Sequence, residues 1–190
     1  MPRAYADIAF TPAVRAMQTS MGSRANDAPR DAATYRRDTL SEREAAFIQA
    51  CDGFYQATVS ETGWPYVQFR GGPAGFLKVL DASTLGYADF RGNVQYISAG
   101  NLTGNDRVAL ILMDHAQQRR LKLLGRVRLV DARDDPALSA RLRVPGYRAQ
   151  VERAALITVE AYDWNCPQHI TPRYTEAEFA LASPGAAGRP

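Results

Sequence analysis

Along the chain, the pattern of apolar and polar positions is weak up to about residue 38 and periodic after it. Residues 1–38 scatter a few apolar side chains among proline, glycine and charged residues, which is typical of an arm with room for one short helix. From Ser41, a serine followed three residues later by Glu44 forms a capping box and predicts a helix that ends near Cys51. The chain end, rich in proline and glycine, should fray. We therefore predict a partly irregular arm over 1–38, one folded domain over 39–183 and a flexible tail over 184–190.

After Gly53 the pattern changes to short runs of β-branched and aromatic residues separated by turn residues, as in an antiparallel sheet or barrel. The residues 61–63 and 91–93 favour tight turns, so pairing between sequential neighbours is the simplest topology. Two further helices are predicted, one from Pro136 and one from a second capping box that begins at Thr175. The predicted strands cover residues 54–60, 64–70, 76–81, 84–88, 94–99, 107–114, 119–131 and 154–162.

Two of these runs indicate where the core lies. The run from Val108 to Met113 is apolar at every position, which predicts a central strand buried on both faces. The run 119–131 alternates, so one face of that strand should be core and the other cationic. Its apolar positions are Leu121, Leu123, Val127 and Leu129, and its cationic positions are Arg120, Lys122, Arg126 and Arg128.

The composition is that of a globular protein, with 46% hydrophobic and 23% charged residues. The net charge of +3 suits an anionic small ligand as well as a nucleic acid, and charge alone does not choose between them. The two cysteines, Cys51 and Cys166, lack a CxxC spacing, so we expect reduced thiols and no metal site. Neither a membrane-spanning apolar run nor a signal sequence is recognisable, and the expected location is the cytoplasm.

Two segments carry groups that could hold a phosphate. The strand 64–70 places Gln68 and Arg70 on one face and runs into Gly71, and arginine beside unobstructed backbone amides is a phosphate-binding arrangement. From these residues alone, a solvated arginine before a glycine loop is the favoured interpretation. The segment 95–102 offers Ser98 and Asn101 as donors to phosphate oxygens. Equally, both side chains could satisfy only their own backbone.

Two further segments are polar or cationic. The run Arg119 to Lys122 could face a phosphate or an aromatic ring across the barrel, although such a stripe is usually solvated. A nucleic-acid surface is disfavoured there, because aromatic residues do not interleave with the cations as a stacking platform requires. Past the last strand, polar and aromatic residues crowd into 162–170, and loops that leave a rigid barrel often carry function. His169 and Cys166 alone fit a surface residue and a buried thiol better than a base and a nucleophile.

Taken in order, these segments resemble the pyridoxamine 5'-phosphate oxidase-like family of FMN-binding split barrels, particularly its uncharacterised flavin-nucleotide-binding branch. The resemblance covers roughly Leu40 to Arg173. It is carried by GWPYVQFRGG (63–72), TLGYADFRGNVQYISAGNL (84–102), NDRVALILMD (105–114), RRLKLLGRVRLVD (119–131) and WNCPQHITPR (164–173).

The resemblance implies a six-stranded antiparallel split β-barrel with flanking helices, which forms a homodimer and binds one FMN at each of two interface sites. It implies phosphate contacts from Arg70, Ser98 and Asn101, with Gln68, Gly71 and Leu102 nearby. It implies further flavin contacts from the strand that holds Arg119, Arg120 and Lys122. The segment around Gln168 and His169 would approach the flavin of the other protomer.

The chain departs from the pyridoxamine 5'-phosphate oxidases proper in three places. Those enzymes carry an Arg-x-x-Leu-Leu-Lys strand, an Arg-Gln-Val-Arg strand and a C-terminal motif for the pyridoxal substrate. Here the FRGG run replaces the first, Arg119-Arg120-Leu121-Lys122 replaces the second, and the third is missing. The resemblance therefore implies flavin binding without vitamin B6 oxidation.

The leading hypothesis is a flavin-dependent oxidoreductase that acts on an unidentified small molecule, in which FMN performs the electron transfer and the protein binds and orients it. No residue is assigned a catalytic role. One alternative is a protein that holds flavin, deazaflavin or haem without turnover. The other is a basic nucleic-acid binder built on an unrelated small barrel.

Overall fold

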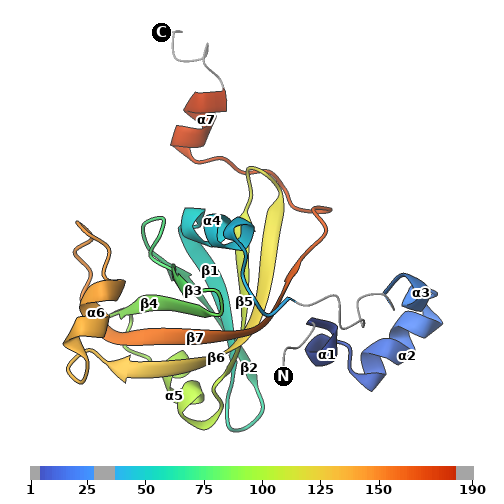
Figure 1. Cartoon of the computed structure of the whole chain (residues 1–190), viewed down its shortest axis with the longest axis horizontal. Helices are drawn as coiled ribbons and strands as arrows, with labels where there is room; N and C mark the ends of the chain where they lie inside the picture. The colour runs from blue at the N-terminus through green and yellow to red at the C-terminus, as the bar shows by residue number, and fades with distance from the viewer. Residues whose placement is uncertain (1–4, 28–36, 183–190) are drawn as a thin grey trace.

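The structure is a computed structural model that describes residues 5–27 and 37–182, so the predicted tail over 184–190 and part of the predicted arm lie outside the described residues. Figure 1 shows strands in the centre and helices around them. The strands are β1 (Gly53–Val59), β2 (Pro65–Gly71), β3 (Lys78–Asp81), β4 (Thr84–Phe90), β5 (Arg107–Asp114), β6 (Arg119–Asp131) and β7 (Val151–Trp164). The helices are α1 (Tyr5–Ala9), α2 (Pro12–Ser20), α3 (Arg24–Asp27), α4 (Glu42–Ala50), α5 (Ile97–Gly104), α6 (Pro136–Leu142) and α7 (Glu176–Ala182).

All strands belong to one antiparallel sheet in the order β2-β1-β5-β6-β7-β4-β3. The mainly β architecture with flanking helices is therefore confirmed. The sheet has seven strands where six were expected, because the short β3 forms a hairpin with β4. No ladder joins β2 to β3 among the described residues, so the sheet stays open between its two edges.

The prediction of purely sequential pairing is wrong at two places. Strand β1 pairs with β5, and β4 pairs with β7, so each of these ladders joins segments that are distant along the chain. Both pairings extend the buried sheet, and they leave β2 and β3 as its edge strands. The ladder between β4 and β7 has a particular consequence, because it sets Asp89 directly opposite Arg153.

The predicted strand over 94–99 is also wrong, because Ile97–Gly104 form helix α5. Val94 and Tyr96 have left-handed φ values of 56° and 54°, which end the extended chain before the helix begins. Ser98 and Leu102, four residues apart, form the buried side of this helix. The β-branched and aromatic residues Val94, Tyr96 and Ile97 therefore favoured a strand where the chain forms a short helix.

The core lies between the inward face of the sheet and helix α4, whose Ser41 and Glu44 form the predicted capping box. Removing one Leu, Ile or Phe side chain from water contributes roughly 1.5–3 kcal/mol, so this cluster is the main stabilising element. Its fully buried side chains include Phe54, Phe76, Leu85, Tyr87, Leu110, Leu112, Leu121, Leu123 and Ile157.

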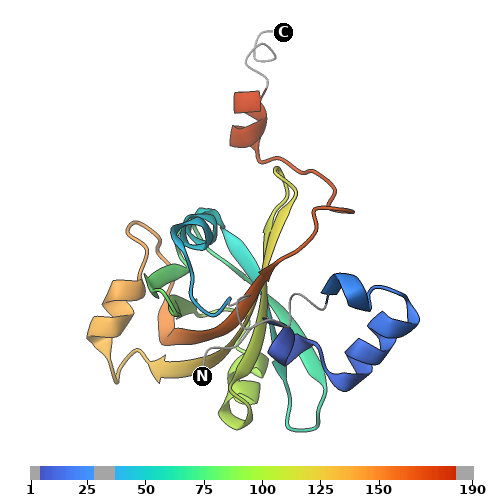
Figure 2. The same ribbon diagram turned by 45° about the vertical axis from the view of Figure 1, so that its right-hand side comes forward.

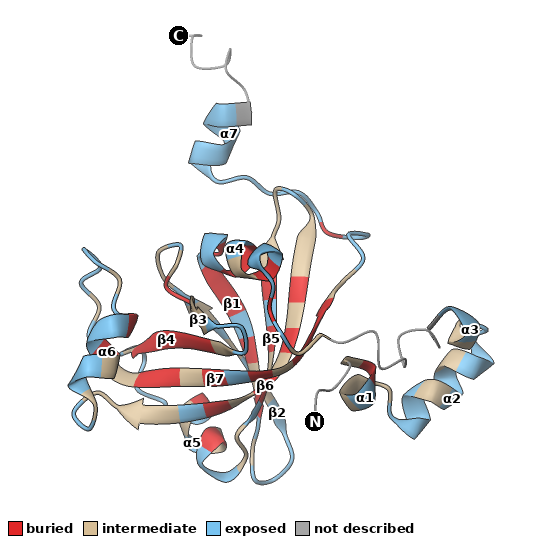
Figure 3. Ribbon diagram, in the orientation of Figure 1, coloured by how far each residue is buried: buried red, intermediate tan, exposed pale blue. Residues whose placement is uncertain are grey.

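Exposed positions alternate with less exposed ones along β1, β2 and β5, and Figure 3 colours the residues by burial. Several of these exposed positions hold apolar side chains. Phe69 on β2 is 57% exposed, whereas Gln68 and Arg70 on the same strand point inward and are half-buried. The inward positions of β1 include the buried polar side chains Gln56 and Thr58. The polarity of this corner is thus inverted, with polar groups inside and apolar groups outside. The apolar outward face consists of Tyr55, Val59, Val67, Phe69 and Ile111, and we call it the outer apolar face.

Strand β5 is central in the sheet, as predicted, since it lies between β1 and β6. Burial on both of its faces was also predicted, and that part is wrong. Leu110 and Leu112 are buried, but Ile111 is 40% exposed because no described element covers the outward side of the strand.

The N-terminal arm contains three helices, more than the single short helix that the sequence suggested. Helix α1 packs on β7 through the buried Ala6, whereas α2 stands away from the sheet in both views (Figure 2). Thr11 caps α2 and Pro12 opens it, a local start signal for a helix. Helix α7 likewise stands away from the sheet, and its capping box from Thr175 to Glu178 is present as predicted. None of the described helices is long and apolar enough to span a bilayer.

Candidate functional site

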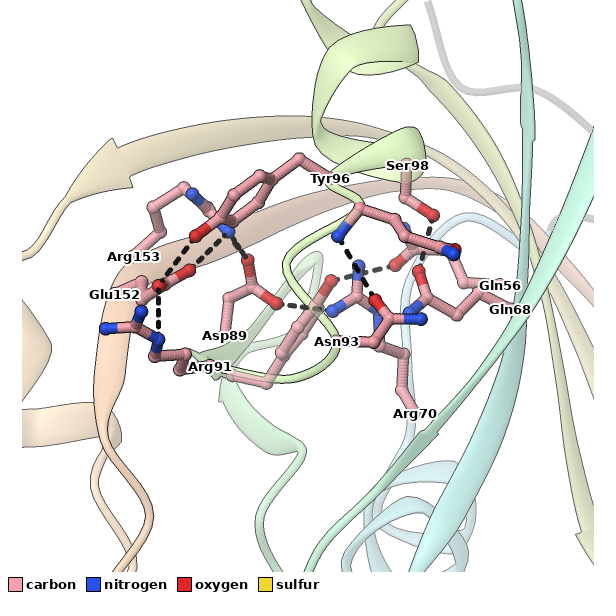
Figure 4. A network of polar contacts seen from close by, with 12 residues as sticks. Gln56, Gln68, Arg70, Asp89, Arg91, Asn93, Tyr96, Ser98, Glu152 and Arg153 are labelled. Carbon is pink, nitrogen blue, oxygen red and sulfur yellow. Dashed lines mark hydrogen bonds and ion pairs between the residues drawn. The ribbon is translucent and has the colours of Figure 1, made fainter.

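A small polar cavity of about 50 Å³ lies where β2, the end of β4, the start of α5 and the start of β7 meet (Figure 4). Gln68, Arg70 and Ser98, three of the residues singled out from the sequence, all line it. Its remaining lining residues are Tyr66, Asp89, Phe90, Gly92, Asn93, Val94, Gln95, Tyr96, Ile97, Ala99, Glu152 and Arg153.

At the centre of this site the carboxylate of Asp89 is held between two guanidinium groups. Arg70 donates to Asp89 Oδ1 from one side, and Arg153 donates to Asp89 Oδ2 from the other, with Nε and a terminal nitrogen both at 2.8 Å. The side chain of Asp89 is 4% exposed, and those of Arg70 and Arg153 are 16% and 23% exposed. A buried carboxylate needs such partners, because an unpaired buried charge is strongly destabilising.

A second acidic group, Glu152, lies at the rim of the cavity. It accepts a hydrogen bond of 2.9 Å from the hydroxyl of Tyr96, and its other oxygen lies 3.1 Å from Arg153. The Arg91 guanidinium is 3.8 Å from the same carboxylate. The hydrogen bond to Glu152 raises the pKa of Tyr96, and the ring of Tyr96 stacks under Arg153 at 5.1 Å. Tyr96 thereby ties the start of helix α5 to β7.

Helix α5 begins at the cavity, and no side chain caps its first turn. Free backbone N–H groups and the helix dipole make such a start favourable for an anion. The hydroxyl of Ser98 in this turn donates to Gln68 on β2, at 2.9 Å. Farther along the helix, the Asn101 amide donates to the Thr58 hydroxyl at 3.0 Å, and Leu102 is buried in the core. Asn101 and Leu102 therefore fix α5 to the sheet from outside the cavity lining.

Two buried nitrogen donors near this site have no acceptor among the described residues: Nε of Arg70 and Nε2 of Gln56. The other end of the Gln56 amide accepts from the Tyr87 hydroxyl at 2.9 Å, and burial raises the pKa of Tyr87 to about 12. Leaving a buried donor without a partner costs about 1–3 kcal/mol. A ligand acceptor that pairs with a guanidinium donor at the edge of a cavity therefore removes this cost, which adds to the free energy of binding.

The arrangement suits one oxyanion group. The cavity combines two arginines with an uncapped helix start, and both features favour negative charge. Its volume is small and compatible with a single phosphate-sized group. Sites for whole cofactors measure roughly 300–1,000 Å³, so this cavity by itself has room only for the anionic end of such a ligand.

Gly71, the next residue singled out, has a packing role in the protomer. A Cβ atom built on Gly71 would come within 2.8 Å of the Phe69 ring, and one on Gly53 within 2.3 Å. The two glycines thus make room for Phe69 to lie across the neighbouring strand. Gly71 does not line the cavity.

The remaining predicted site residues lie elsewhere. Arg119, Arg120 and Lys122 are at the start of β6, whereas Asp131 at its end pairs with Arg153 beside the cavity. At about 3.3 Å per residue, these two ends of β6 are about 40 Å apart along the strand. In the protomer, the structure therefore does not bring the two groups of predicted residues together.

These three cations are engaged with their own neighbours. Arg119 stacks on the rings of Phe47 and Trp164, at 4.9 and 5.1 Å, and Arg120 donates to the Cys166 carbonyl at 3.1 Å. The ammonium of Lys122 lies 4.9 Å from the ring of Tyr5. Gln168 and His169 lie nearby in the exposed turn after β7, where His169 has a left-handed φ of 64°. Together these five residues form a second group of candidate cofactor contacts.

Sequence reasoning missed Asp89, Arg153, Glu152 and Tyr96. A signal existed for Asp89, because a carboxylate on the inward parity of an otherwise apolar strand points to a buried ion pair. Its partner Arg153 could not be found, since only the β4 and β7 ladder joins two residues 64 positions apart. Within the described residues, no group of three His, Cys, Asp or Glu side chains could hold a metal ion.

The family model of pyridoxamine 5'-phosphate oxidase matches residues 40–164, which is more than half of the chain. No curated protein sequence matches the chain. The match runs from two residues before α4 to the end of β7, and it includes the cavity and the start of β6.

Solved structures of low sequence identity share the fold. A candidate pyridoxamine 5'-phosphate oxidase from Lactobacillus delbrueckii has 22% identity and a TM-score of 0.51, over 66% of this chain and 94% of that one. HupZ from Group A Streptococcus has 14% identity and a TM-score of 0.50, over 71% and 99% of the two chains. A conserved hypothetical protein from Mycobacterium tuberculosis has 17% identity and a TM-score of 0.50, over 73% and 93%. At these identities the likeness concerns the fold alone, and it confirms the expected split-barrel class.

Proposed function

The chain belongs to the pyridoxamine 5'-phosphate oxidase-like family, and from that premise we propose that it is a homodimeric FMN-binding protein that acts as a flavin-dependent oxidoreductase on a small molecule. The cavity beside Arg70 carries this proposal. It offers two arginines, the start of α5 and a buried Nε donor of Arg70 that has no acceptor among the described residues. The phosphate of FMN supplies the missing acceptor, so the residues fit the group.

In this proposal the phosphate lies against Arg70, Ser98 and the first turn of α5. The Ser98 hydroxyl donates its proton to Gln68 in this structure, so it would turn from Gln68 to the cavity to donate to a phosphate oxygen, beside the backbone N–H groups of the first turn of α5. Asn101 acts indirectly, by holding α5 against Thr58. Leu102 anchors the same helix in the core, and Gly71 lets Phe69 pack across β1.

In this proposal a second copy of the chain contributes the rest of the cofactor site, because the cavity beside Arg70 has room for little more than the phosphate. The outer apolar face supports a homodimer, since contiguous exposed apolar surface on a sheet marks an interaction site. Tyr55 and Phe69, whose rings are 5.3 Å apart, provide the aromatic contacts that are enriched at interfaces.

The dimer also accounts for the separation of the two groups of predicted residues. Arg70 and Ser98 would come from one protomer, and the group at Arg119, Arg120, Lys122, Gln168 and His169 from the other. A two-fold axis repeats such a site twice, which gives two flavins per dimer. Residues 166–169 of the turn after β7 are exposed in their own protomer, so their side chains are accessible for contacts of this kind.

When FMN is bound, it supplies the hydride or electron transfer, and the protein supplies binding, orientation and electrostatic tuning. The residues described above bind and orient, and we assign no catalytic acid or base to this chain. The proposal does not extend to vitamin B6 oxidation, because the substrate motif of those enzymes is missing from the sequence. Cytoplasmic location and the division into arm, domain and tail stay predictions.

An absorbance spectrum of the purified full chain tests the proposal. Oxidised flavin bands that disappear on adding a reductant and return in air support a redox-active flavoprotein. If the protein is colourless and no band is retained after incubation with FMN and gel filtration, the proposal fails. A Soret band would favour a haem-binding function, and a flavin that stays oxidised with every reductant would favour a binding protein without turnover.

A further inference from the structure

The proposed phosphate site contains a carboxylate where a phosphate site is expected to be purely cationic. Asp89 lines the cavity together with Arg70 and Arg153. An anion that enters is repelled by this carboxylate, and the repulsion is strong because Asp89 is only 3% exposed. The presence of Asp89 therefore requires a reason beyond attraction of the ligand.

The charges around the cavity give that reason. Arg70 and Arg153 contribute +2 and Asp89 contributes −1, which leaves +1, and the start of α5 adds about +0.5. At the rim, the charges of Arg91 and Glu152 cancel. The total of about +1.5 is close to the charge of a phosphate monoester, about −1.5 to −2 at pH 7.

We propose that Asp89 acts as a resident counter-anion that sets the selectivity of this site, with Arg153 as its second cation. Asp89 holds the two guanidinium groups in position and limits the cationic charge to what one phosphate monoester neutralises. Free phosphate or sulfate gains too little at this charge to replace its hydration. A nucleotide binds because its remaining atoms add contacts that a free ion lacks. The inference rests on the proposed function only in its choice of nucleotide.

The test compares three variants of the full chain: Asp89→Asn, Arg153→Gln and the double variant that carries both. They change the charge of the cavity to about +2.5, +0.5 and +1.5. Binding of inorganic phosphate and of sulfate is measured by calorimetry at constant ionic strength, with chloride as the balancing salt. Binding of FMN and riboflavin is measured on the same samples by quenching of flavin fluorescence.

We expect Asp89→Asn to bind inorganic phosphate about tenfold more tightly or better, a modest fraction of what one charge does at a few ångströms. The affinity for FMN should increase by a smaller factor, so the preference for FMN over free phosphate falls. Arg153→Gln should weaken FMN binding about tenfold and leave riboflavin binding unchanged, because riboflavin has no phosphate. The double variant should return phosphate binding to within about threefold of the unmodified protein.

A folded Asp89→Asn protein with unchanged or weaker phosphate binding would overturn the inference. If that variant does not fold, the other two decide, since the double variant keeps the original charge balance. Equal phosphate binding by Arg153→Gln and by the double variant would then exclude a role for Asp89. Failure of the flavin proposal is separate: it appears as absent FMN binding in the unmodified protein, whatever the phosphate results are.

Discussion

Replacing Arg70 by alanine is the sharpest test of the proposed phosphate contact. The substitution removes a charged donor whose Nε is buried and has no acceptor among the described residues. A hydrogen bond to a charged group contributes about 1.5–3 kcal/mol, so the Kd for FMN should rise about 10- to 150-fold. Asp89 keeps its two contacts with Arg153 in this variant, so the fold retains a partner for the buried carboxylate.

The assay is a fluorescence titration of apo-protein with FMN and, in parallel, with riboflavin. Arg141→Ala is the matched control, because Arg141 is an exposed arginine on α6 outside the cavity lining, and its loss changes the net charge equally. We expect the control to bind FMN within about twofold of the unmodified protein, since a distant exposed charge is screened. An unchanged FMN affinity in folded Arg70→Ala would refute the phosphate assignment. Equal losses for FMN and riboflavin would refute it too, because the effect would then not involve phosphate.

Other regions of the molecule give three further predictions. Phe69→Asp places a charge on the outer apolar face and should convert the proposed dimer to monomers in sedimentation velocity and abolish FMN retention. A variant that stays dimeric would show that this face is not the interface. Burial and the nearby Asp114 raise the pKa of the Cys51 thiol to about 12, so only the exposed Cys166 should react with a thiol reagent at pH 8 before denaturation. Tyr87 has a pKa of about 12 in the folded state, against an ordinary 10 in the unfolded chain. Between these two pH values the unfolded chain loses the proton and the folded protein keeps it. The contribution of Tyr87 to the free energy of unfolding is therefore complete below pH 10 and declines up to pH 12 by about 1.4 kcal/mol per pH unit. Urea unfolding at pH 8 and pH 11 should show a smaller decline for Tyr87→Phe, and equal declines would contradict the assigned burial effect.

The parts of the fold that were predictable are those whose pattern is local and long. The bounds of the strands 107–114 and 119–131 match β5 and β6, because sustained apolar runs and alternation determine them. The helix at Glu42–Ala50 was found from its capping box, which depends on residues three positions apart. The start of helix α5 was mistaken for a strand, since Val94, Tyr96 and Ile97 are residue types with a high strand propensity and the run is too short to show a helical period.

In the candidate site, too, local patterns were predictable from the sequence and contacts between distant segments were not. Gln68, Arg70 and Ser98 were found because each is near a glycine or a turn that suggests accessible backbone. The partners that determine their electrostatics, Asp89 and Arg153, come together only through pairing between distant strands. No periodicity in one sequence encodes such a pairing, because it depends on the topology of the whole sheet.

The inverted polarity of β1 and β2 links assembly to folding. A monomer that leaves Phe69 and its neighbours in water forgoes part of the burial that stabilises an ordinary sheet of this size. If the native state is the dimer, mass action makes its melting temperature rise with protein concentration, and dilution alone unfolds some of the chains. The edge strand β2, with apolar side chains and an unpaired backbone edge, would then be the part of the diluted protein most prone to irreversible association.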